Sequence, residues 1–73
     1  MNINFELYKI FYEVALAGSI SGGAKKLMIS QPAVTQAIHN LEDELGGKLF
    51  IRTPKGVIFT NEGRKLFEYV SMG

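Results

Sequence analysis

Cysteine is absent from this 73-residue sequence, and histidine occurs once. The chain therefore has no disulfide framework, iron–sulfur centre or thiolate zinc site, and one imidazole does not replace them. An enzyme needs a cleft with a nucleophile and base or a metal constellation, which so short a chain with one histidine does not supply. We predict no catalytic residue, no cofactor and no metal ion. Because the chain lacks disulfides and metal sites, its stability must come from packing.

Long hydrophobic runs are also missing. No run approaches the roughly 18 to 20 apolar residues of a membrane-spanning helix, and residues 1–4 lack the basic region and apolar core of a signal peptide. We expect a cytoplasmic protein without membrane contact. Hydrophobic residues still make up 47% of the chain, too many for a disordered tail. Because a domain of this size buries only about 60% of its unfolded surface, a partner or a longer parent chain would add stability.

An excess of one charge is missing too, since the net charge is only +1. The charges are nevertheless segregated along the chain. The ranges 18–30 and 46–59 carry +2 and +3 and contain no acid, whereas range 31–45 carries −3. The positive charge thus lies in two blocks, a distribution that suits contact with a polyanion better than the net charge suggests.

Apolar periodicity predicts a helix over residues 4–17 that ends at Gly18. A short helix of about two turns follows, and either Ser19 or Ser21 can accept hydrogen bonds from its free N–H groups. Two consecutive glycines in this helix cost about 1 kcal/mol each relative to alanine. We therefore expect Gly23 to face a crossing helix. If that helix leaves room for a methyl group, Gly23→Ala should stabilise the domain by up to about 1 kcal/mol.

A third helix is indicated by Ser30, which can cap it, and by Pro32 in the first turn, where the missing N–H costs nothing. The glycine pair 46–47 ends it. The outer face is polar and uncharged in its N-terminal half, and the acids at 42–44 are expected in solvent. Its predicted core face consists of apolar side chains at helical spacing: Val34, Ile38, Leu41 and Leu45.

Two short β-prone runs, 49–51 and 57–59, flank a segment whose proline and glycine suit a hairpin turn. We expect Arg52 and Lys55 at the tip of this hairpin. Thr60 can cap a fourth helix. That helix carries a small or apolar stripe: Gly63, Leu66, Phe67 and Val70.

This order of elements is that of a winged helix-turn-helix, a mainly α fold with a three-helix core, a two-stranded β-hairpin wing and the start of a fourth, linker helix. The DNA major groove, about 12 Å wide, accepts one α-helix, and side chains with both donors and acceptors distinguish base edges. Gln31, Thr35 and Gln36 have that character. Phosphates are held by hydroxyls, helix N-termini and basic groups. Such groups occur at Ser21, Lys25, Lys26, Ser30, Arg52 and Lys55.

Several linked motifs cover nearly the whole chain in a fixed order. They are Gly18-Ser19-Ile20, Gly23-Ala24-Lys25-Lys26-Leu27, Ile29-Ser30-Gln31-Pro32-Ala33-Val34-Thr35-Gln36-Ala37-Ile38, Leu41-Glu42-Asp43-Glu44-Leu45-Gly46, Leu49-Phe50-Ile51-Arg52-Thr53 and Thr60-Asn61-Glu62-Gly63. Together they resemble the N-terminal winged helix-turn-helix of LysR-type transcriptional regulators. Gly23 departs from the alanine usual in that family.

The resemblance implies sequence-specific binding to a pseudo-palindromic site in double-stranded DNA for bacterial transcription regulation. Residues 1–59 would form the DNA-binding domain, and 60–73 would begin a linker helix that makes a homodimer or higher oligomer. A ligand-sensing domain would lie outside this fragment, which itself would bind no small molecule. The implied base-reading residues are Gln31, Pro32, Thr35 and Gln36; the implied wing contacts are Arg52, Pro54 and Lys55; and the implied dimerisation residues are Leu66, Phe67 and Val70.

Some interpretations stay open. A winged helix also serves as a protein–protein module, and the fold alone does not exclude that role. His39 on the outer helical face is either solvated or a possible DNA contact, and Lys25 and Lys26 are either surface lysines or phosphate ligands. Gln36 stands where the family commonly has arginine, so a bidentate arginine–guanine contact is not expected there.

Overall fold

The computed structural model describes residues 3–72. Met1, Asn2 and Gly73 lie outside the described residues, and so does the first half of the N-terminal segment that lacks signal-peptide features. The two strands pair antiparallel, with Phe50 opposite Phe59 and Thr53 opposite Gly56. The expected winged helix-turn-helix order is confirmed. The elements are α1 (Ile3–Ala17), α2 (Ile20–Leu27), α3 (Gln31–Leu45), β1 (Phe50–Thr53), β2 (Gly56–Phe59) and α4 (Asn61–Met72).

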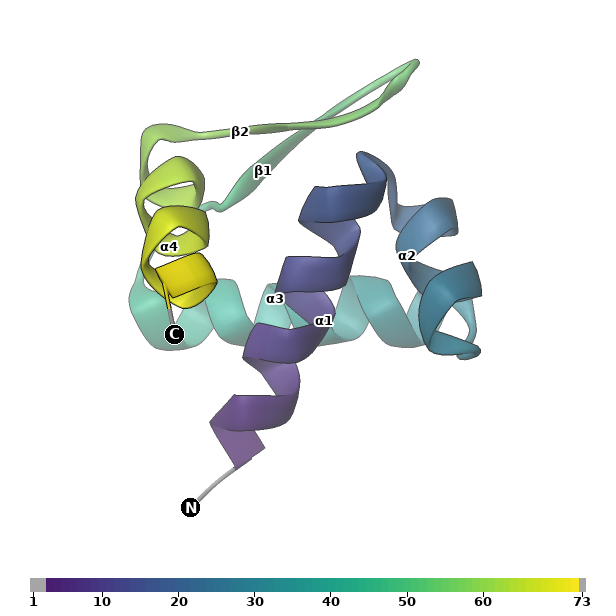
Figure 1. Ribbon diagram of the computed structural model, residues 1–73, viewed down its shortest axis with the longest axis horizontal. Coiled ribbons are helices and arrows are strands. Elements are labelled where there is room, and N and C mark those ends of the chain that lie inside the picture. Colours follow the sequence, from purple (N-terminus) through teal and green to yellow (C-terminus); the bar gives the residue numbers. More distant parts are fainter. Residues whose placement is uncertain (1–2, 73) are drawn as a thin grey trace.

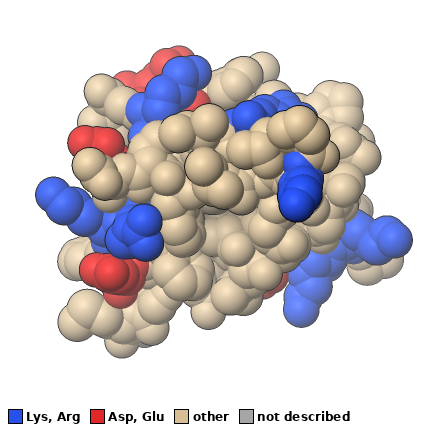
Figure 2. All heavy atoms as spheres, turned by 90° about the horizontal axis from the view of Figure 1, so that it is seen from above, with Lys and Arg blue, Asp and Glu red and all other residues tan. Residues whose placement is uncertain are grey.

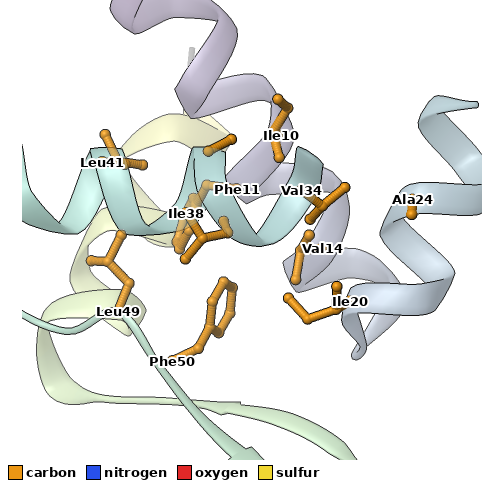
Figure 3. Packing of buried hydrophobic residues seen from close by; sticks show 11 residues of the cluster. Ile10, Phe11, Val14, Ile20, Ala24, Val34, Ile38, Leu41, Leu49 and Phe50 are labelled. Carbon is orange, nitrogen blue, oxygen red and sulfur yellow. The ribbon is translucent and has the colours of Figure 1, made fainter. Parts of the chain in front are cut away.

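Helix α1 is the centre of the assembly and packs against α2, α3 and α4. In Figure 1 it crosses in front of α3, with α2 on one side and α4 on the other, while the hairpin extends above them from α4 toward α2. Figure 3 shows core side chains from α1, α3 and the segment before β1 pointing toward one another. The largest fully buried side chains are Phe11, Leu41, Leu49, Val14 and Val34.

Hydroxyl caps begin three of the helices. Ser19 Oγ accepts from the N–H of Gly22 at 3.0 Å, so Ser19 rather than Ser21 caps α2. Ser30 Oγ accepts from the third residue of α3 at 3.2 Å. Thr60 Oγ1 accepts from Gly63 N–H at 3.0 Å. Each cap satisfies an N–H group that the helix itself leaves free, which fixes where α2, α3 and α4 begin.

Gly23 is buried where α2 crosses α1, as expected. A Cβ atom at this position would lie 2.7 Å from Val14 Cγ2 and 3.0 Å from Val14 Cα. Both distances are shorter than ordinary van der Waals contact. The room that a stabilising Gly23→Ala requires is therefore not present, and the glycine allows the close approach of the two helices.

Three expectations about individual positions are wrong. Leu45 is 47% exposed, because the end of α3 extends past α1 (Figure 1); Ala37, which flanks the predicted stripe, is buried in the core cluster. Glu42 is buried rather than solvated, because it accepts a backbone hydrogen bond from the start of the wing. Arg52 lies within β1 opposite Val57 and not at the tip, because the turn is only Pro54-Lys55.

Met28, in the turn between α2 and α3, has a φ of 61°, and its side chain is 89% exposed. The left-handed conformation costs most L-residues about 1–2 kcal/mol, and asparagine tolerates it better. Met28→Asn is therefore expected to raise the free energy of unfolding by about 1 kcal/mol, which corresponds to about 4–8 °C in Tm. Thermal unfolding followed by circular dichroism checks this, with Met28→Val as a control that should lower Tm. A lower Tm for Met28→Asn would contradict the strain argument.

Candidate nucleic-acid interface

The N-terminal half of α3 presents uncharged polar side chains to solvent. Gln31, Pro32 and Gln36 are exposed, and Thr35 is half-buried. The Ser30 cap and the proline in the first turn fix the start of the helix. The predicted base-reading residues therefore lie on a preformed helix with their donors and acceptors accessible.

Gln36 is linked to Asn40, which sequence reasoning did not single out. Gln36 Nε2 donates to Asn40 Oδ1 at 2.9 Å across one helical turn. The i, i+4 spacing of two amides is the signal that could have predicted it. The bond uses one of the two amide donors of Gln36, so the side chain keeps a donor and an acceptor for other partners.

The far end of the wing rests on the turn between α1 and α2. Val57 N–H donates to the carbonyl of Gly18 at 2.9 Å. Gly56 has a φ of 143°, and a Cβ atom there would overlap the same Gly18 carbonyl oxygen. The turn itself is closed by Thr53, whose Oγ1 donates to Gly56 O and accepts from Lys55 N–H, both at 3.2 Å. The wing is thereby held at a fixed place beside the helix-turn-helix.

Five of the predicted site residues surround one open hollow between the wing tip and the first turns of α2 and α3. The hollow measures about 230 Å³. It is lined by groups from three parts of the chain, which the fold brings together. The predicted residues among them are Ser21, Gln31, Arg52, Pro54 and Lys55.

Arg52 also lines a second hollow, between α3 and β1, together with Thr35 and His39. Arg52 therefore lines both the hollow at the wing tip and the hollow beside α3. His39 is exposed, and its place beside Thr35 and Arg52 puts it on the same side of α3 as the wing. No shared hollow was foreseen from sequence, because it depends on how the hairpin packs across α3.

Lys25 and Lys26 lie apart from both hollows. They are exposed in the last turn of α2, where a positive charge is favourable near the helix C-terminus. Figure 2 looks onto the wing side and shows basic side chains spread over this face, while most of the visible acidic surface lies on the left, the side of α4 and the end of α3. On the half of the face that carries α2, the start of α3 and the wing tip, most of the surface is uncharged, and the charged side chains that are visible are mainly basic.

The predicted dimerisation residues of α4 are engaged within the chain. Leu66, Phe67 and Val70 are half-buried and pack against the core cluster. Phe67 stacks on Tyr12 with ring centroids 5.5 Å apart. The large apolar side chains that α4 exposes are Tyr69 and Met72 instead.

Two further features concern what residues 3–72 do not contain. No helix in this part of the chain is both long and apolar enough to cross a membrane. Within the same described range, no group of three or more histidine, cysteine, aspartate or glutamate residues could hold a metal ion.

Characterised relatives are transcriptional regulators that are much longer than this chain. The RuBisCO operon transcriptional regulator of Allochromatium vinosum is 39% identical over 69 residues, which are 94% of this chain and 23% of that protein. The HTH-type transcriptional regulator CzcR of Bacillus cereus strain ZK is 46% identical over 63 residues, which are 86% of this chain and 22% of the relative. The chain thus spans less than a quarter of either protein.

Solved structures agree with the sequence comparison. The structure of CbnR, a LysR family transcriptional regulator, matches 93% of this chain and 24% of its own with a TM-score of 0.88 at 35% identity. The complex of the BenM DNA-binding domain with benA site 1 DNA matches 92% of this chain and 78% of its own with a TM-score of 0.86 at 34% identity. Residues 5–64 match the family described as bacterial regulatory helix-turn-helix protein, lysR family. The chain therefore belongs to the lysR family of bacterial regulatory helix-turn-helix proteins.

Proposed function

We propose that this chain is the sequence-specific DNA-binding domain of a bacterial transcription regulator. In this proposal α3 enters the major groove and the wing contacts the backbone or the minor groove. The observation that carries it is the convergence of Gln31, Ser21 and the wing residues on one hollow at the start of α3. The relatives are also named as transcriptional regulators and not as enzymes.

The chemistry of the face supports this function. An α-helix with its side chains is about 10–12 Å across and fits the major groove. The amides of Gln31 and Gln36 can pair with adenine N6 and N7. Arg52, Lys55 and the α2 lysines supply positive charge around the helix, and phosphate contacts of this kind orient a protein on the duplex. The DNA-binding domain of BenM, which is similar to this chain, has been solved in complex with DNA, and a second CbnR structure is a complex of its DNA-binding domain with DNA.

We further propose that residues 1–59 form the DNA-binding domain and 60–73 begin a linker helix to an effector-binding domain of a longer cytoplasmic protein. The protein would act as a homodimer or higher oligomer on a pseudo-palindromic operator, with recognition helices about 34–36 Å apart or a multiple of that distance. Exposed apolar groups near the end of α4, Tyr69 and Met72, line an open groove with Phe5 of α1. That apolar surface supports association, because large exposed apolar patches mark interaction sites.

Salt-dependent binding to duplex DNA tests the proposal. With about four to six phosphate contacts, a plot of log affinity against log salt should have a slope of roughly −4 to −5 for each domain. A module that binds only proteins would show no steep dependence. Fluorescence anisotropy with a labelled duplex across a salt series measures the slope. Nanomolar binding of the isolated 73-residue chain to one half-site at physiological salt would contradict the need for two copies.

Arg52→Ala should weaken binding to all sequences by a similar factor and make the salt slope shallower by about 1, if Arg52 meets a phosphate. Arg64→Ala is the matched control, because Arg64 is an exposed arginine on α4 away from both hollows. It should change neither the slope nor the affinity by a comparable amount. The measurement is competition between specific and random duplexes at several salt concentrations. A loss confined to one base pair would instead assign Arg52 to base reading.

A further inference from the structure

Glu42 is a buried acid at the C-terminal end of α3, only 8% exposed, whereas its neighbours Asp43 and Glu44 are exposed. Its Oε2 accepts a hydrogen bond from the backbone N–H of Leu49 at 2.8 Å. Its Oε1 lies 3.8 Å from Lys48 Nζ. The lysine side chain is 75% exposed, so solvent screens this ion pair. The bond to the Leu49 N–H is the stronger link, because the acceptor is charged and the bond is buried.

The bond between Glu42 and Leu49 satisfies two groups that would otherwise be costly. A buried carboxylate is unfavourable unless it is hydrogen-bonded. Leu49 is fully buried and lies immediately before β1, so its N–H would lose its partner if the carboxylate were removed. The contact thus joins the recognition helix directly to the first residues of the wing.

The other side of this segment is held by the start of α4. Thr60 N–H donates to Leu49 O at 3.1 Å, and Thr60 Oγ1 donates to Lys48 O at 2.7 Å. We call the four residues Glu42, Lys48, Leu49 and Thr60 the wing clasp. Between them they connect α3, the base of the hairpin and α4, so the hairpin projects from a point fixed on both sides.

We propose that Glu42 is a positioning residue that sets the orientation of the wing relative to the recognition helix. The inference rests on the proposed DNA-binding function. Arg52 lies three residues beyond Leu49 along β1, or about 10 Å at the rise of a strand. Val57, which lies opposite Arg52 in the strand register, is hydrogen-bonded to Gly18 O, so a shift of the chain at Leu49 would turn the hairpin about that contact and change the position of Arg52 relative to α3. A fixed position of Arg52 relative to α3 lets the wing meet a phosphate while α3 reads bases.

Substitutions at Glu42 and the adjacent exposed Asp43 test the role. Glu42→Gln keeps an acceptor for the Leu49 N–H, and Glu42→Leu removes it. Asp43→Asn and Asp43→Leu are the matched controls, because each removes the same charge one residue away without touching the clasp. Affinity for duplex DNA and its salt slope are measured on the 73-residue chain at a temperature where circular dichroism shows every variant folded.

Glu42→Gln is expected to bind within about twofold of Asp43→Asn, since the amide oxygen replaces the carboxylate oxygen. Glu42→Leu should bind all sequences about tenfold more weakly than Asp43→Leu, with a salt slope shallower by about 1. Adding Arg52→Ala to Glu42→Leu should then have little further effect. That lack of additivity is the readout that a purely structural role would not produce.

The inference is overturned if folded Glu42→Leu matches Asp43→Leu in affinity and slope, even when it is less stable. Should Glu42→Leu not fold, Glu42→Asp replaces it, because this variant keeps the charge but its side chain is one methylene too short to reach the Leu49 N–H. Its weaker binding and shallower slope would support the inference, and binding like that of the unsubstituted chain would overturn it. If the unsubstituted chain shows no salt-dependent binding, the DNA-binding proposal fails, and this inference fails with it.

Discussion

Gly23→Ala is expected to lower the free energy of unfolding by about 1–3 kcal/mol, the usual cost of overpacking a well-filled site. Alanine has the higher helix propensity, by about 1 kcal/mol, so propensity alone would give the opposite sign. The added methyl would meet Val14 Cγ2 at 2.7 Å and Val14 Cα at 3.0 Å. Val14 is fully buried and β-branched, so a helix leaves its side chain one strongly preferred rotamer, and no rotation of that side chain relieves the contact with Val14 Cα. The two helices must therefore move apart.

A double-mutant cycle with Val14→Ala isolates this contact. Val14→Ala alone should be destabilising, because it removes buried methyl groups. In that background Gly23→Ala should cost less than in the unsubstituted chain, by about 0.5–3 kcal/mol of coupling. Urea unfolding of the four proteins gives the numbers. A higher unfolding midpoint for Gly23→Ala alone would mean that α1 and α2 are farther apart than the structure has them.

The helices and the hairpin could be predicted from sequence because their signals are local. Ser30, with Pro32 two residues later, marks the start of α3, and Gly46 ends the helix with a φ of 81°. Thr60 caps α4 in the same way. Such caps act through neighbouring backbone groups, so they can be identified without knowing which elements pack together.

Positions decided by distant contacts could not be predicted in this way. Helical spacing places Leu45 on the apolar face of α3, but nothing in that spacing says that the end of α3 extends past α1. Glu42 belongs to an acidic run typical of solvent, and its burial depends on the Leu49 N–H seven residues away. Arg52 was misplaced because the length of the turn sets the strand register. The sequence predicted that Gly23 faces a helix. It could not predict that Val14 leaves no room there for a methyl group.

The candidate site divides along the same line. The polar face of α3 could be predicted from residue types and the helical period, because these alone place Gln31 and Gln36 on the side of the helix that faces solvent. The hollow that Gln31 shares with Arg52 depends on the anchoring of the wing to Gly18, a contact between segments far apart in sequence. The family resemblance implied that α3 and the wing both contact DNA, but it did not imply that Gln31 and Arg52 share a hollow. The roles of individual residues in reading DNA stay predictions.

Gln31→Ala is expected to cost about 1–3 kcal/mol on the preferred duplex and to relax the preference at one base pair, because it removes a paired amide. Gln31 is exposed at the first position of α3, so the substitution leaves the core intact and should not unfold the domain. Competition binding with matched and single-base-changed duplexes at several salt concentrations measures both effects. The salt slope should stay unchanged, since no phosphate contact is lost.

Asn61→Ala provides the matched control for Gln31→Ala. Asn61 is also an exposed amide at the first position of a helix, but that helix is α4, outside both hollows. Its removal should leave affinity and base preference as they are, which separates the loss of a base contact from the loss of an amide at a helix start. Uniform weakening by Gln31→Ala across all duplexes would remove Gln31 from the base-reading set. The amide would then act on the sugar–phosphate backbone beside Arg52, and specificity would have to come from Thr35 and Gln36.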